Sequence, residues 1–290
     1  TMYFAGISDE AGSSIEEQIA AHKQLGWKHL ELRLINGTNL TAVDDATFEN
    51  VVEKVTAAGM KVCSFASALA NWGRPITTDF EVDVAELKAA LPRMQRLGTL
   101  YIRCMSWPNA KEEKWADDVW RDEAVRRMKI LAQMANDGGV ILIHENCDGW
   151  GGDSPANTLE LLERVDSPAL KLVYDTGNPV AHGQDAHAYL KEVIDYVVHV
   201  HIKDGKKDAE GKVQWTYPGE GTCQVEKCVQ TLIKHGYDAG YSIEPHIASI
   251  IHTGQGIGDQ NIEKVKLESY LEYGRKFMAL YDGVVGGIKL

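Results

Sequence analysis

Eight short apolar segments recur along the chain, and each is followed by a polar loop and an amphipathic stretch. The segments lie at residues 3–7, 28–34, 60–66, 99–104, 139–144, 169–174, 196–202 and 240–244. Several of them are nearly unbroken runs of aliphatic side chains, which is typical of parallel strands that helices cover on both faces. This regular alternation restricts the chain to an α/β architecture.

The stretches between the apolar segments have the spacing of helices. The apolar side chains that recur on one face of residues 121–135 are Val125, Met128, Leu131 and Ala132. Comparable stripes run through residues 15–25 and 47–58. The glycines that stand just before the next apolar segment are Gly26, Gly59, Gly98 and Gly236. Because glycine accepts the left-handed backbone that ends many helices, these positions predict helix ends. Ser154 and Pro155 match an N-cap and the first position of a helix.

Eight such units predict a single (β/α)8 TIM barrel that spans residues 1–290, because this fold typically needs about 250 residues. A doubly wound open sheet is the alternative, and it often carries a glycine-rich phosphate loop after its first strand. Residues 8–12 read SDEAG at that place, which is no such loop. No change of composition marks a second domain.

The balance of charges limits the partners. The chain has 42 acidic and 30 basic residues and a net charge of −12 at pH 7. Nucleic acids and anionic membranes both attract clusters of Lys and Arg, so we expect neither as a partner. The five cysteines are irregularly spaced, and neither a secretory leader nor a membrane-spanning apolar run is evident. These features predict reduced thiols and a cytoplasmic protein.

Polar residues stand where the predicted strands end, and in an eightfold barrel those ends meet at the mouth that holds the active site. Four successive strands finish with Glu145, Asp175, His201 and Glu244. A single strand-end carboxylate or histidine is more often a helix cap or a core residue, so the prediction depends on all four together. Three carboxylates and an imidazole at one mouth require a cation to offset their repulsion. They suit one divalent metal, with Mn²⁺ favoured over Mg²⁺, Co²⁺, Fe²⁺ or Zn²⁺.

Two further histidines lie next to these residues in the sequence. Side chains alternate along a strand, so His144 points away from Glu145 unless the strand end bends. By the same rule His199 shares a face with His201. A structural role in the core is the plainer interpretation of both His144 and His199.

The ordered motifs resemble the xylose isomerase-like barrel superfamily and, within it, the sugar phosphate isomerase/epimerase family. The motifs are SDE (8–10), LELR (30–33), HEN (144–146), DTGN (175–178), HVHIKD (199–204), GEG (219–221) and IEPH (243–246). The resemblance implies an eightfold barrel with one divalent metal, whose ligands fall on the same four strand-end residues. In the keto-sugar epimerases of this superfamily two glutamate ligands act as acid and base on opposite faces of the substrate. Glu145 and Glu244 match those positions.

Some positions depart from the family pattern. Asn178 stands where many members have a histidine that contacts a substrate oxygen. The arginine that the epimerases carry beyond the metal-ligating histidine has no clear match, and Lys203 or Lys207 takes its place. His144 directly before Glu145 is not typical of the free-sugar epimerases, and we regard it as a candidate additional base. The tryptophans of the predicted βα loops are Trp72, Trp107, Trp115, Trp150 and Trp215. Such residues stack on sugars or flat aglycones, or else pack at a rim or an oligomer interface.

We therefore expect substrate contacts from strand-end polar residues and from two of the loop tryptophans. The expected residues are Glu10, Arg33, Arg103, Asn178, Lys203, His246, Trp107 and Trp150. For the charged members of this set, buried salt bridges that tie the barrel together are the alternative. No phosphate-binding loop is evident, so we expect a substrate without phosphate.

Two enzymatic functions fit these residues. The first is isomerisation or epimerisation of a keto-sugar by proton transfer through a metal-stabilised enediolate. The alternative is a lyase that cleaves 3-keto-glycosides, O- or C-linked, by β-elimination, as some relatives do, sometimes with a partner subunit. A DNA-repair endonuclease of the superfamily would need additional histidine ligands, and the acidic charge also disfavours it. An inactive partner subunit is disfavoured by the intact ligand set. We expect a homo-oligomer, or a hetero-oligomer with a second subunit.

Overall fold

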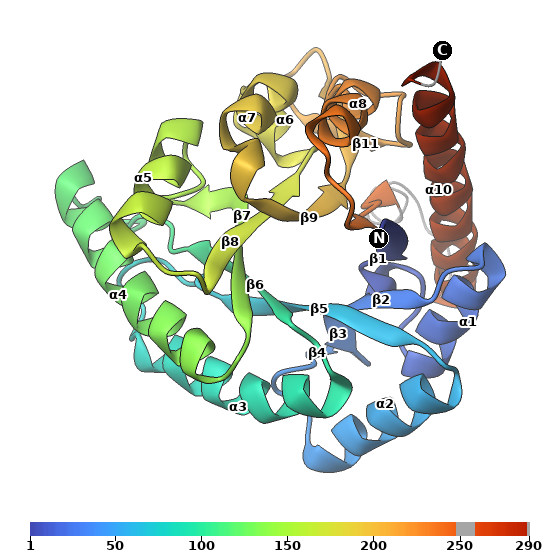
Figure 1. The fold of residues 1–290 in the computed structure, drawn as a ribbon, viewed down its shortest axis with the longest axis horizontal. Coiled ribbons are helices and arrows are strands. Elements are labelled where there is room, and N and C mark those ends of the chain that lie inside the picture. The colour runs from blue at the N-terminus through green and yellow to red at the C-terminus, as the bar shows by residue number, and fades with distance from the viewer. Residues whose placement is uncertain (248–258, 289–290) are drawn as a thin grey trace.

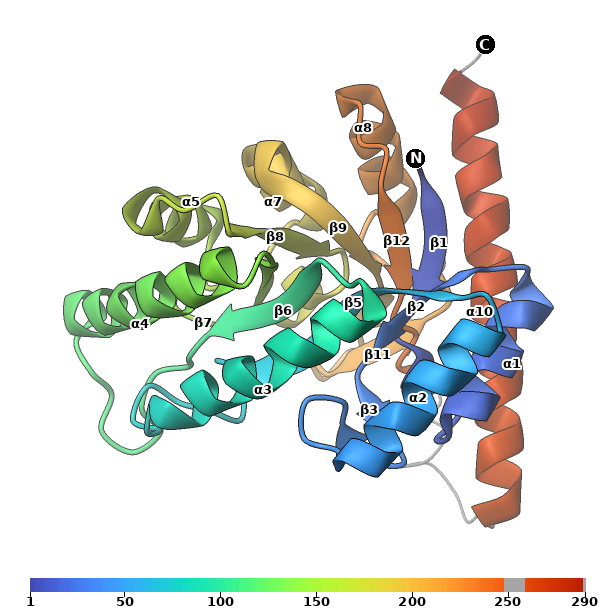
Figure 2. The same cartoon turned by 60° about the horizontal axis from the view of Figure 1, so that its bottom comes forward.

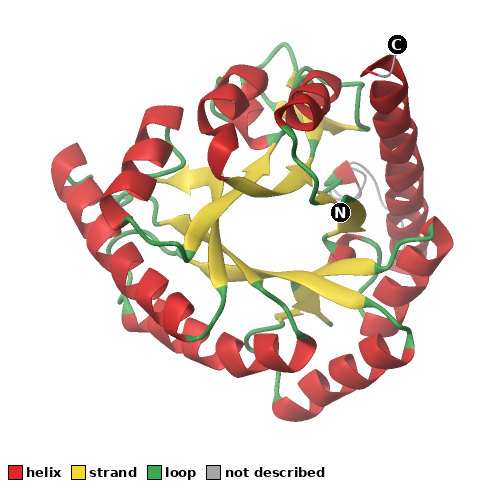
Figure 3. Cartoon of the chain, in the orientation of Figure 1, coloured by secondary structure: helices red, strands yellow, loops and turns green. Residues whose placement is uncertain are grey.

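Eight parallel strands form a ring that helices enclose (Figures 1 and 3). The computed structural model describes residues 1–247 and 259–288. The strands of the ring are β1 (Tyr3–Gly6), β2 (His29–Leu32), β5 (Lys61–Leu69), β6 (Tyr101–Ser106), β7 (Ile141–Gly149), β8 (Leu170–Asp175), β9 (Val197–Ile202) and β12 (Gly240–Ile243). Each strand lies within or over one of the predicted apolar segments. The fold is therefore the predicted single (β/α)8 barrel.

The strand order confirms the barrel. Around the ring the strands pair in the order β1, β12, β9, β8, β7, β6, β5, β2, and every pair is parallel. The ring closes between β1 and β2 through a single parallel bridge from Ile7 to Glu31. Glu31 thus lies at the seam of the barrel.

Helices follow most of the strands and cover the outside of the ring. The α-helices are α1 (Ile15–Leu25), α2 (Asp45–Ala57), α3 (Glu81–Leu97), α4 (Asp117–Asp137), α5 (Pro155–Val165), α6 (Asn178–Ala181), α7 (Ala186–Val193), α8 (Val225–His235) and α10 (Asp259–Ile288). Short 3-10 helices η1 (Ser8–Glu10) and η2 (Ile194–Tyr196) join the connections. The helical stretches expected from the sequence lie within or over α1, α2 and α4.

Local signals set the ends of these helices. Ser14 and Glu17 form a reciprocal capping box at the start of α1, and Gly26 ends that helix at φ 73°. Ser154 accepts a hydrogen bond from the backbone N–H of Asn157 at 3.0 Å, which makes it the predicted N-cap of α5. The predicted helix boundaries therefore follow from capping chemistry.

The last helix, α10, is long and lies along the side of the barrel (Figure 2). It contacts α1 and α8 and so takes the place of the helix that closes the outer layer. The buried Tyr270 hydroxyl of α10 lies 3.0 Å from the imidazole of His22 in α1. Across residues 1–247 and 259–288, no helix is both long and apolar enough to span a membrane.

Two small hairpins extend the strand ends. They are built from β3 (Leu34–Ile35) with β4 (Thr38–Asn39), and from β10 (Asp204–Lys207) with β11 (Val213–Thr216). The Asp204 carboxylate anchors the second hairpin by accepting backbone N–H groups of Gly219 and Gly221. A Cβ on Gly221 would lie 2.2 Å from an Asp204 oxygen, so this glycine permits the contact. The HVHIKD and GEG motifs therefore hold this hairpin at the barrel mouth.

Candidate metal centre

The four strand-end residues selected from the sequence converge at the mouth of the barrel. Glu145 lies in β7, Asp175 ends β8, His201 lies in β9 and Glu244 follows β12, which are successive strands of the ring. Each of them offers one ligand atom, and these four atoms all lie within 4.8 Å of one another. All four residues are buried, with at most 3% of their surface exposed.

Backbone contacts at the strand ends fix the orientation of Asp175. The side-chain amide of Asn146 donates to the Asp175 carbonyl at 2.9 Å and accepts from its backbone N–H at 2.8 Å. Oδ1 of Asp175 accepts the backbone N–H groups of Gly177 at 2.8 Å and Asn178 at 2.7 Å. The HEN and DTGN motifs therefore lock one carboxylate oxygen and leave the other directed into the cluster.

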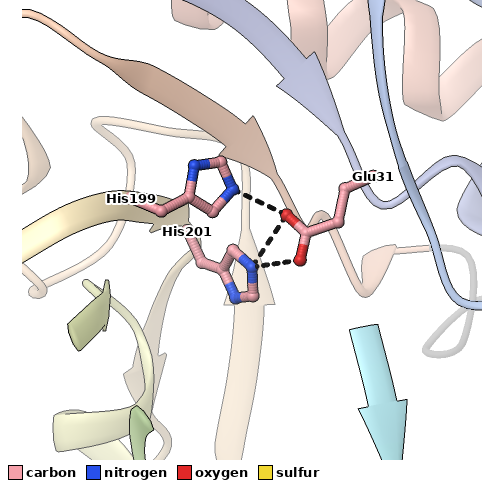
Figure 4. A group of neighbouring side chains, drawn as sticks. All are labelled: Glu31, His199 and His201. Atoms are coloured by element: carbon pink, nitrogen blue, oxygen red, sulfur yellow. Dashed lines mark hydrogen bonds and ion pairs between the residues drawn. The ribbon is translucent and has the colours of Figure 1, made fainter. Parts of the chain in front are cut away.

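The imidazole of His201 lies between carboxylates on both sides. Its Nδ1 is 2.8 Å from Oε1 of Glu145. On the other side, its Nε2 is 2.8 Å from Oε2 of Glu31, as Figure 4 shows. Burial lowers the pKa of this imidazole, but Glu31 and Glu145 outweigh that effect and raise it well above its ordinary value.

Three cationic side chains surround the cluster. Nζ of Lys203 lies 3.0 Å from Glu244 and 3.3 Å from Oδ2 of Asp175. Arg33 contacts Glu244 at 3.2 Å, and Arg103 lies 3.5 Å from Glu145. These contacts link every carboxylate of the cluster to a basic side chain.

The surrounding charges lower the pKa of two of the carboxylates, whereas the pKa of the third is raised. Burial acts to raise the pKa of Glu244, but Lys203 and other cations hold it well below the ordinary value. Arg103 and His201 likewise overcome burial and lower the pKa of Glu145. Burial raises the pKa of Asp175 to about 7, because Glu244 and Glu145 add to it and Lys203 only partly opposes it. The two glutamates are therefore the groups held in the carboxylate form.

The residues present fit a divalent metal ion. The buried Oδ2 of Asp175 receives no hydrogen bond in the described part of the chain, so its lone pairs are available to a ligand. Three carboxylates and one imidazole form the oxygen-rich donor set that Mn²⁺ and Mg²⁺ prefer. A further group of His201 with Glu31 and His199 lies directly behind this set.

A pocket of about 560 Å³ reaches the cluster, and Glu145 and Glu244 both line it. Five of the residues expected to contact substrate also line it, namely Arg33, Arg103, Asn178, Lys203 and His246. Glu10 stands behind His246 instead, where its carboxylate accepts the His246 backbone N–H at 2.6 Å. Glu10 therefore positions His246 at the wall of the pocket.

The structure places Trp107 and Trp150, two of the residues expected to contact substrate, away from the pocket. Both are buried, with 0% and 2% of their surface exposed, and neither lines the pocket. The indole N–H of Trp107 donates to Asp83 at 2.9 Å, outside the ring of strands. Both tryptophans belong to the packing between the barrel and its helices.

The structure also argues against His144 as an additional base. Its side chain is 1% exposed, and its Nε2 lies 2.9 Å from the hydroxyl of Ser106 in β6. Burial lowers the pKa of His144 to about 4, so the ring is neutral near pH 7. The alternation of side chains along β7 holds, and His144 faces away from the pocket that Glu145 lines.

Two other tryptophans line the pocket, although the sequence gave no reason to prefer them over Trp107 and Trp150. Trp72 lies in the loop after β5 and is 61% exposed. Trp215 lies in β11, with its ring centroid 5.0 Å from Nζ of Lys203. Both tryptophans lie in segments that follow strands of the ring, and this position is the one feature of the sequence that could have placed them near the pocket.

The contact between Glu31 and His201 was also missed, because it joins residues 170 positions apart. In the sequence Glu31 stands in the LELR motif (30–33), and no pattern there assigns a partner to it. Its position on the same face of the barrel interior as His201 depends on the closure between β1 and β2.

Comparisons with known proteins agree with this geometry. The model of the family described as xylose isomerase-like TIM barrel matches residues 19–266. The inosose dehydratase of Geobacillus thermodenitrificans strain NG80-2 is 25% identical over 151 residues, which cover 47% of this chain and 49% of that enzyme. The matched region thus spans about half the length of this curated relative.

Two solved structures share the fold over nearly the whole chain. An L-ribulose 3-epimerase superimposes with a TM-score of 0.73 at 16% identity, covering 100% of this chain and 97% of the other. The IolI protein, whose structure includes a bound zinc atom, superimposes with a TM-score of 0.75 at 16% identity, covering 98% and 99%. At such identities the similarity establishes the fold alone.

Proposed function

We propose that this chain, which belongs to the xylose isomerase-like TIM barrel family, is a divalent-metal-dependent isomerase or epimerase of a keto-sugar. The observation that carries this proposal is the convergence of Glu145, Asp175, His201 and Glu244 within 4.8 Å beside a pocket of about 560 Å³. These four residues would hold the metal, and Mn²⁺ is the ion we favour. When bound, such a cation polarises a substrate carbonyl and offsets the negative charge that follows loss of a neighbouring proton.

Glu145 and Glu244 are the candidates for moving the proton. Their low pKa values keep both in the carboxylate form, which is the form that accepts a proton. They come from β7 and from the end of β12, with β8 and β9 between them in the ring. They therefore approach the pocket from the two ends of an arc of four strands. Epimerisation requires such an arrangement, because a proton leaves one side of a carbon and another returns on the opposite side.

The basic side chains of the pocket would orient the substrate. Arg33, Arg103 and Lys203 line the pocket and present N–H donors beside the carboxylates. Donors of this kind bind sugar hydroxyls and the oxygen on which charge develops. Asn178 and His246 add further polar contacts at the same wall.

A lyase that acts on 3-keto-glycosides by β-elimination is the second candidate. Elimination and epimerisation share their first step, the loss of a proton next to a carbonyl, so the same carboxylates serve both. The observation that favours this candidate is the exposed indole of Trp72 at the wall of the pocket, which would stack on an aglycone. The inosose dehydratases among the relatives are named for an elimination.

The test is NMR of the Mn²⁺-reconstituted and then Mg²⁺-exchanged protein in D₂O with free ketoses, an inosose and 3-keto-glucosides. We expect deuterium to appear next to a carbonyl, and this exchange to disappear in Glu145→Gln and Glu244→Gln. The exposed Glu53→Gln, on the outer helix α2, is the matched control and should exchange at the wild-type rate. An epimer as product supports the first candidate, and a released aglycone or water supports the second. Exchange that persists in both glutamine variants would contradict the proposal.

The state of the protein in the cell is part of the same proposal. All five cysteines are free, which supports a reducing, cytoplasmic location. We propose a small keto-sugar or keto-glycoside as the partner, and neither nucleic acid nor membrane. We also propose a homo-oligomer, or a hetero-oligomer with a second subunit. Light scattering of the purified chain, with and without extract from its source cells, tests the oligomeric state.

A further inference from the structure

Behind the metal cluster, the carboxylate of Glu31 receives two imidazoles. Its Oε1 lies 2.8 Å from Nε2 of His199 and 3.0 Å from Nε2 of His201, and its Oε2 lies 2.8 Å from Nε2 of His201 (Figure 4). All three side chains are 0% exposed. A buried carboxylate is costly unless it is paired, so this arrangement must be satisfied by the two rings.

Glu31 reaches this position from the opposite side of the seam. It lies in β2, whereas both histidines lie in β9, and its backbone makes the bridge to Ile7 that closes the barrel. Within residues 1–247 and 259–288, both ion pairs of its carboxylate are with imidazoles. No lysine or arginine in that part of the chain forms a salt bridge with it.

The contact with Glu31 determines which ring nitrogens of His199 and His201 carry hydrogen. An ionised carboxylate accepts hydrogen bonds and does not donate them, so each Nε2 that faces Glu31 carries its hydrogen. The other nitrogen of His201, Nδ1, faces the metal cluster, at 2.8 Å from Glu145 and 3.9 Å from Asp175. A bound cation would take the place of the hydrogen that Nδ1 shares with Glu145, whereas the hydrogen on Nε2 would stay with Glu31. A neutral imidazole with hydrogen on Nε2 has its lone pair on Nδ1, which is the form that binds a metal.

We infer that Glu31 is the positioning residue of the metal centre. It holds the Nε2–H form of His201 and thereby presents Nδ1 as the ligand atom, in the way that carboxylates behind metal-binding histidines fix tautomer and ring orientation. His199 supports this role, because its second hydrogen bond to Oε1 restrains rotation of the carboxylate. The inference rests on the metal centre of the proposed function.

Two other roles are compatible with the same contacts, and they predict different results. A purely structural ion pair would change stability without changing the ligand atom of His201. A second metal ion held by Glu31, His199 and His201 would add a second equivalent of bound metal. The experiments must therefore report on the tautomer and on stoichiometry, as well as on affinity.

The first experiment uses the wild-type protein, loaded with Zn²⁺ and labelled with ¹⁵N-histidine. We expect NMR to find the His201 hydrogen on Nε2 and a metal-bound Nδ1, assigned by the loss of these signals in His201→Gln. A metal-bound Nε2 would overturn the inference, and so would hydrogen on Nδ1. This measurement does not depend on the folding of any Glu31 variant.

The second experiment measures Co²⁺ affinity by calorimetry in Glu31→Gln. The amide group of glutamine would place a second donor against Nε2–H of His201, so this ring loses its preferred tautomer. We expect Co²⁺ binding 10- to 100-fold weaker than in the wild type, with a changed Co²⁺ absorption spectrum. Tyr270→Phe removes a comparable buried hydrogen bond, to His22, and is the matched control with wild-type affinity.

The outcomes separate the inference from the function it rests on. Unchanged affinity and spectrum in a folded Glu31→Gln would overturn the positioning role while leaving the proposed function intact. Loss of a second equivalent of metal in that variant would overturn it in favour of a second site. A wild-type chain that binds no metal at all would overturn both.

Discussion

The barrel mouth and the layer between the barrel and its helices both bury charged side chains, but they satisfy them differently. In the outer layer, the buried Asp83 accepts hydrogen bonds from the backbone N–H of Ala70 at 2.8 Å, from Arg74 at 2.8 Å and from Trp107 at 2.9 Å. At the mouth, Oδ2 of Asp175 receives no hydrogen bond from the described residues and has one ion pair, with Lys203 at 3.3 Å, while Glu145 and Glu244 lie beside it.

The difference shows that burial of a carboxylate does not by itself mark a functional site. The Asp83 carboxylate is satisfied by donors of the chain, so it completes the fold without any ligand. The Asp175 carboxylate has one oxygen that accepts no hydrogen bond from the described residues, and it lies beside two further carboxylates, so this oxygen is available to a cation. The functional site is recognised here by a buried carboxylate oxygen that accepts no hydrogen bond from the described residues.

The largest effect is expected from Asp175→Asn, which removes charge at the mouth. We expect turnover to fall at least about 1,000-fold, because the metal loses a ligand. The metal-free variant should be as stable as the wild type at pH 8 or more stable, by up to about 3 kcal/mol. The reason is that the raised pKa of Asp175 makes its ionised form unfavourable in the folded state. Steady-state kinetics and denaturant unfolding measure the two effects, and a clear loss of stability would contradict this account.

The same substitution in the outer layer, Asp83→Asn, should act in the opposite way. In asparagine, an NH2 group replaces one of the two carboxylate oxygens. Either the indole N–H of Trp107 or the backbone N–H of Ala70 therefore loses its acceptor, and Arg74 loses its ion pair. We expect the free energy of unfolding to fall by about 3 kcal/mol. The rate per folded molecule should stay within about two-fold of the wild type. If the two aspartate variants changed stability alike, the distinction between the regions would be wrong.

A buried histidine in each region sharpens the contrast through pH. Burial lowers the pKa of His22 to about 4, and its partners are the neutral Gln18 carbonyl and Tyr270 hydroxyl. The pKa of His201 is raised instead, because carboxylates flank it.

The sign of the expected pH effect follows for His22. The unfolded chain binds a proton at pH 6.5 and the folded chain only near pH 4, so His22 stabilises the fold above pH 6.5 and this contribution is lost on acidification. The loss should reach about 3 kcal/mol across that window, at up to about 1.4 kcal/mol per pH unit. Denaturant unfolding of His22→Phe at several pH values checks this, since the variant should lack that part of the slope. Parallel curves for variant and wild type would contradict the prediction.

Most of the fold could be predicted from the sequence because its signals are local. Each strand is a short apolar run, and each of α1 and α5 begins at a capping serine, so neighbouring residues alone determine these elements. The four residues of the cluster could be selected for a related reason. In a parallel barrel all strands end at one mouth, so Glu145 and Asp175 meet although they lie in different units.

The expected site residues that lie away from the pocket are next to the mouth in the sequence but face the outer layer in space. His144 precedes Glu145 and Trp107 follows Ser106, but both side chains point away from the pocket. The alternation of side chains along the strand predicts this orientation for His144. At Trp107 the backbone turns with a positive φ of 56°, and no local sequence pattern predicts that turn. The partner of Glu31 could not be predicted, because a contact across the seam depends on the closed barrel.

The most direct test of the metal centre is a titration of the purified chain with Mn²⁺, followed by the EPR signal of the free ion. The account predicts that the wild type removes one equivalent of Mn²⁺ per chain. It also predicts that a Glu145→Gln, Glu244→Gln double variant removes almost none at the same concentration, while its circular dichroism stays that of the wild type. A folded wild type that takes up no Mn²⁺, or a double variant that binds it undiminished, would contradict the assignment of the barrel mouth as a metal centre.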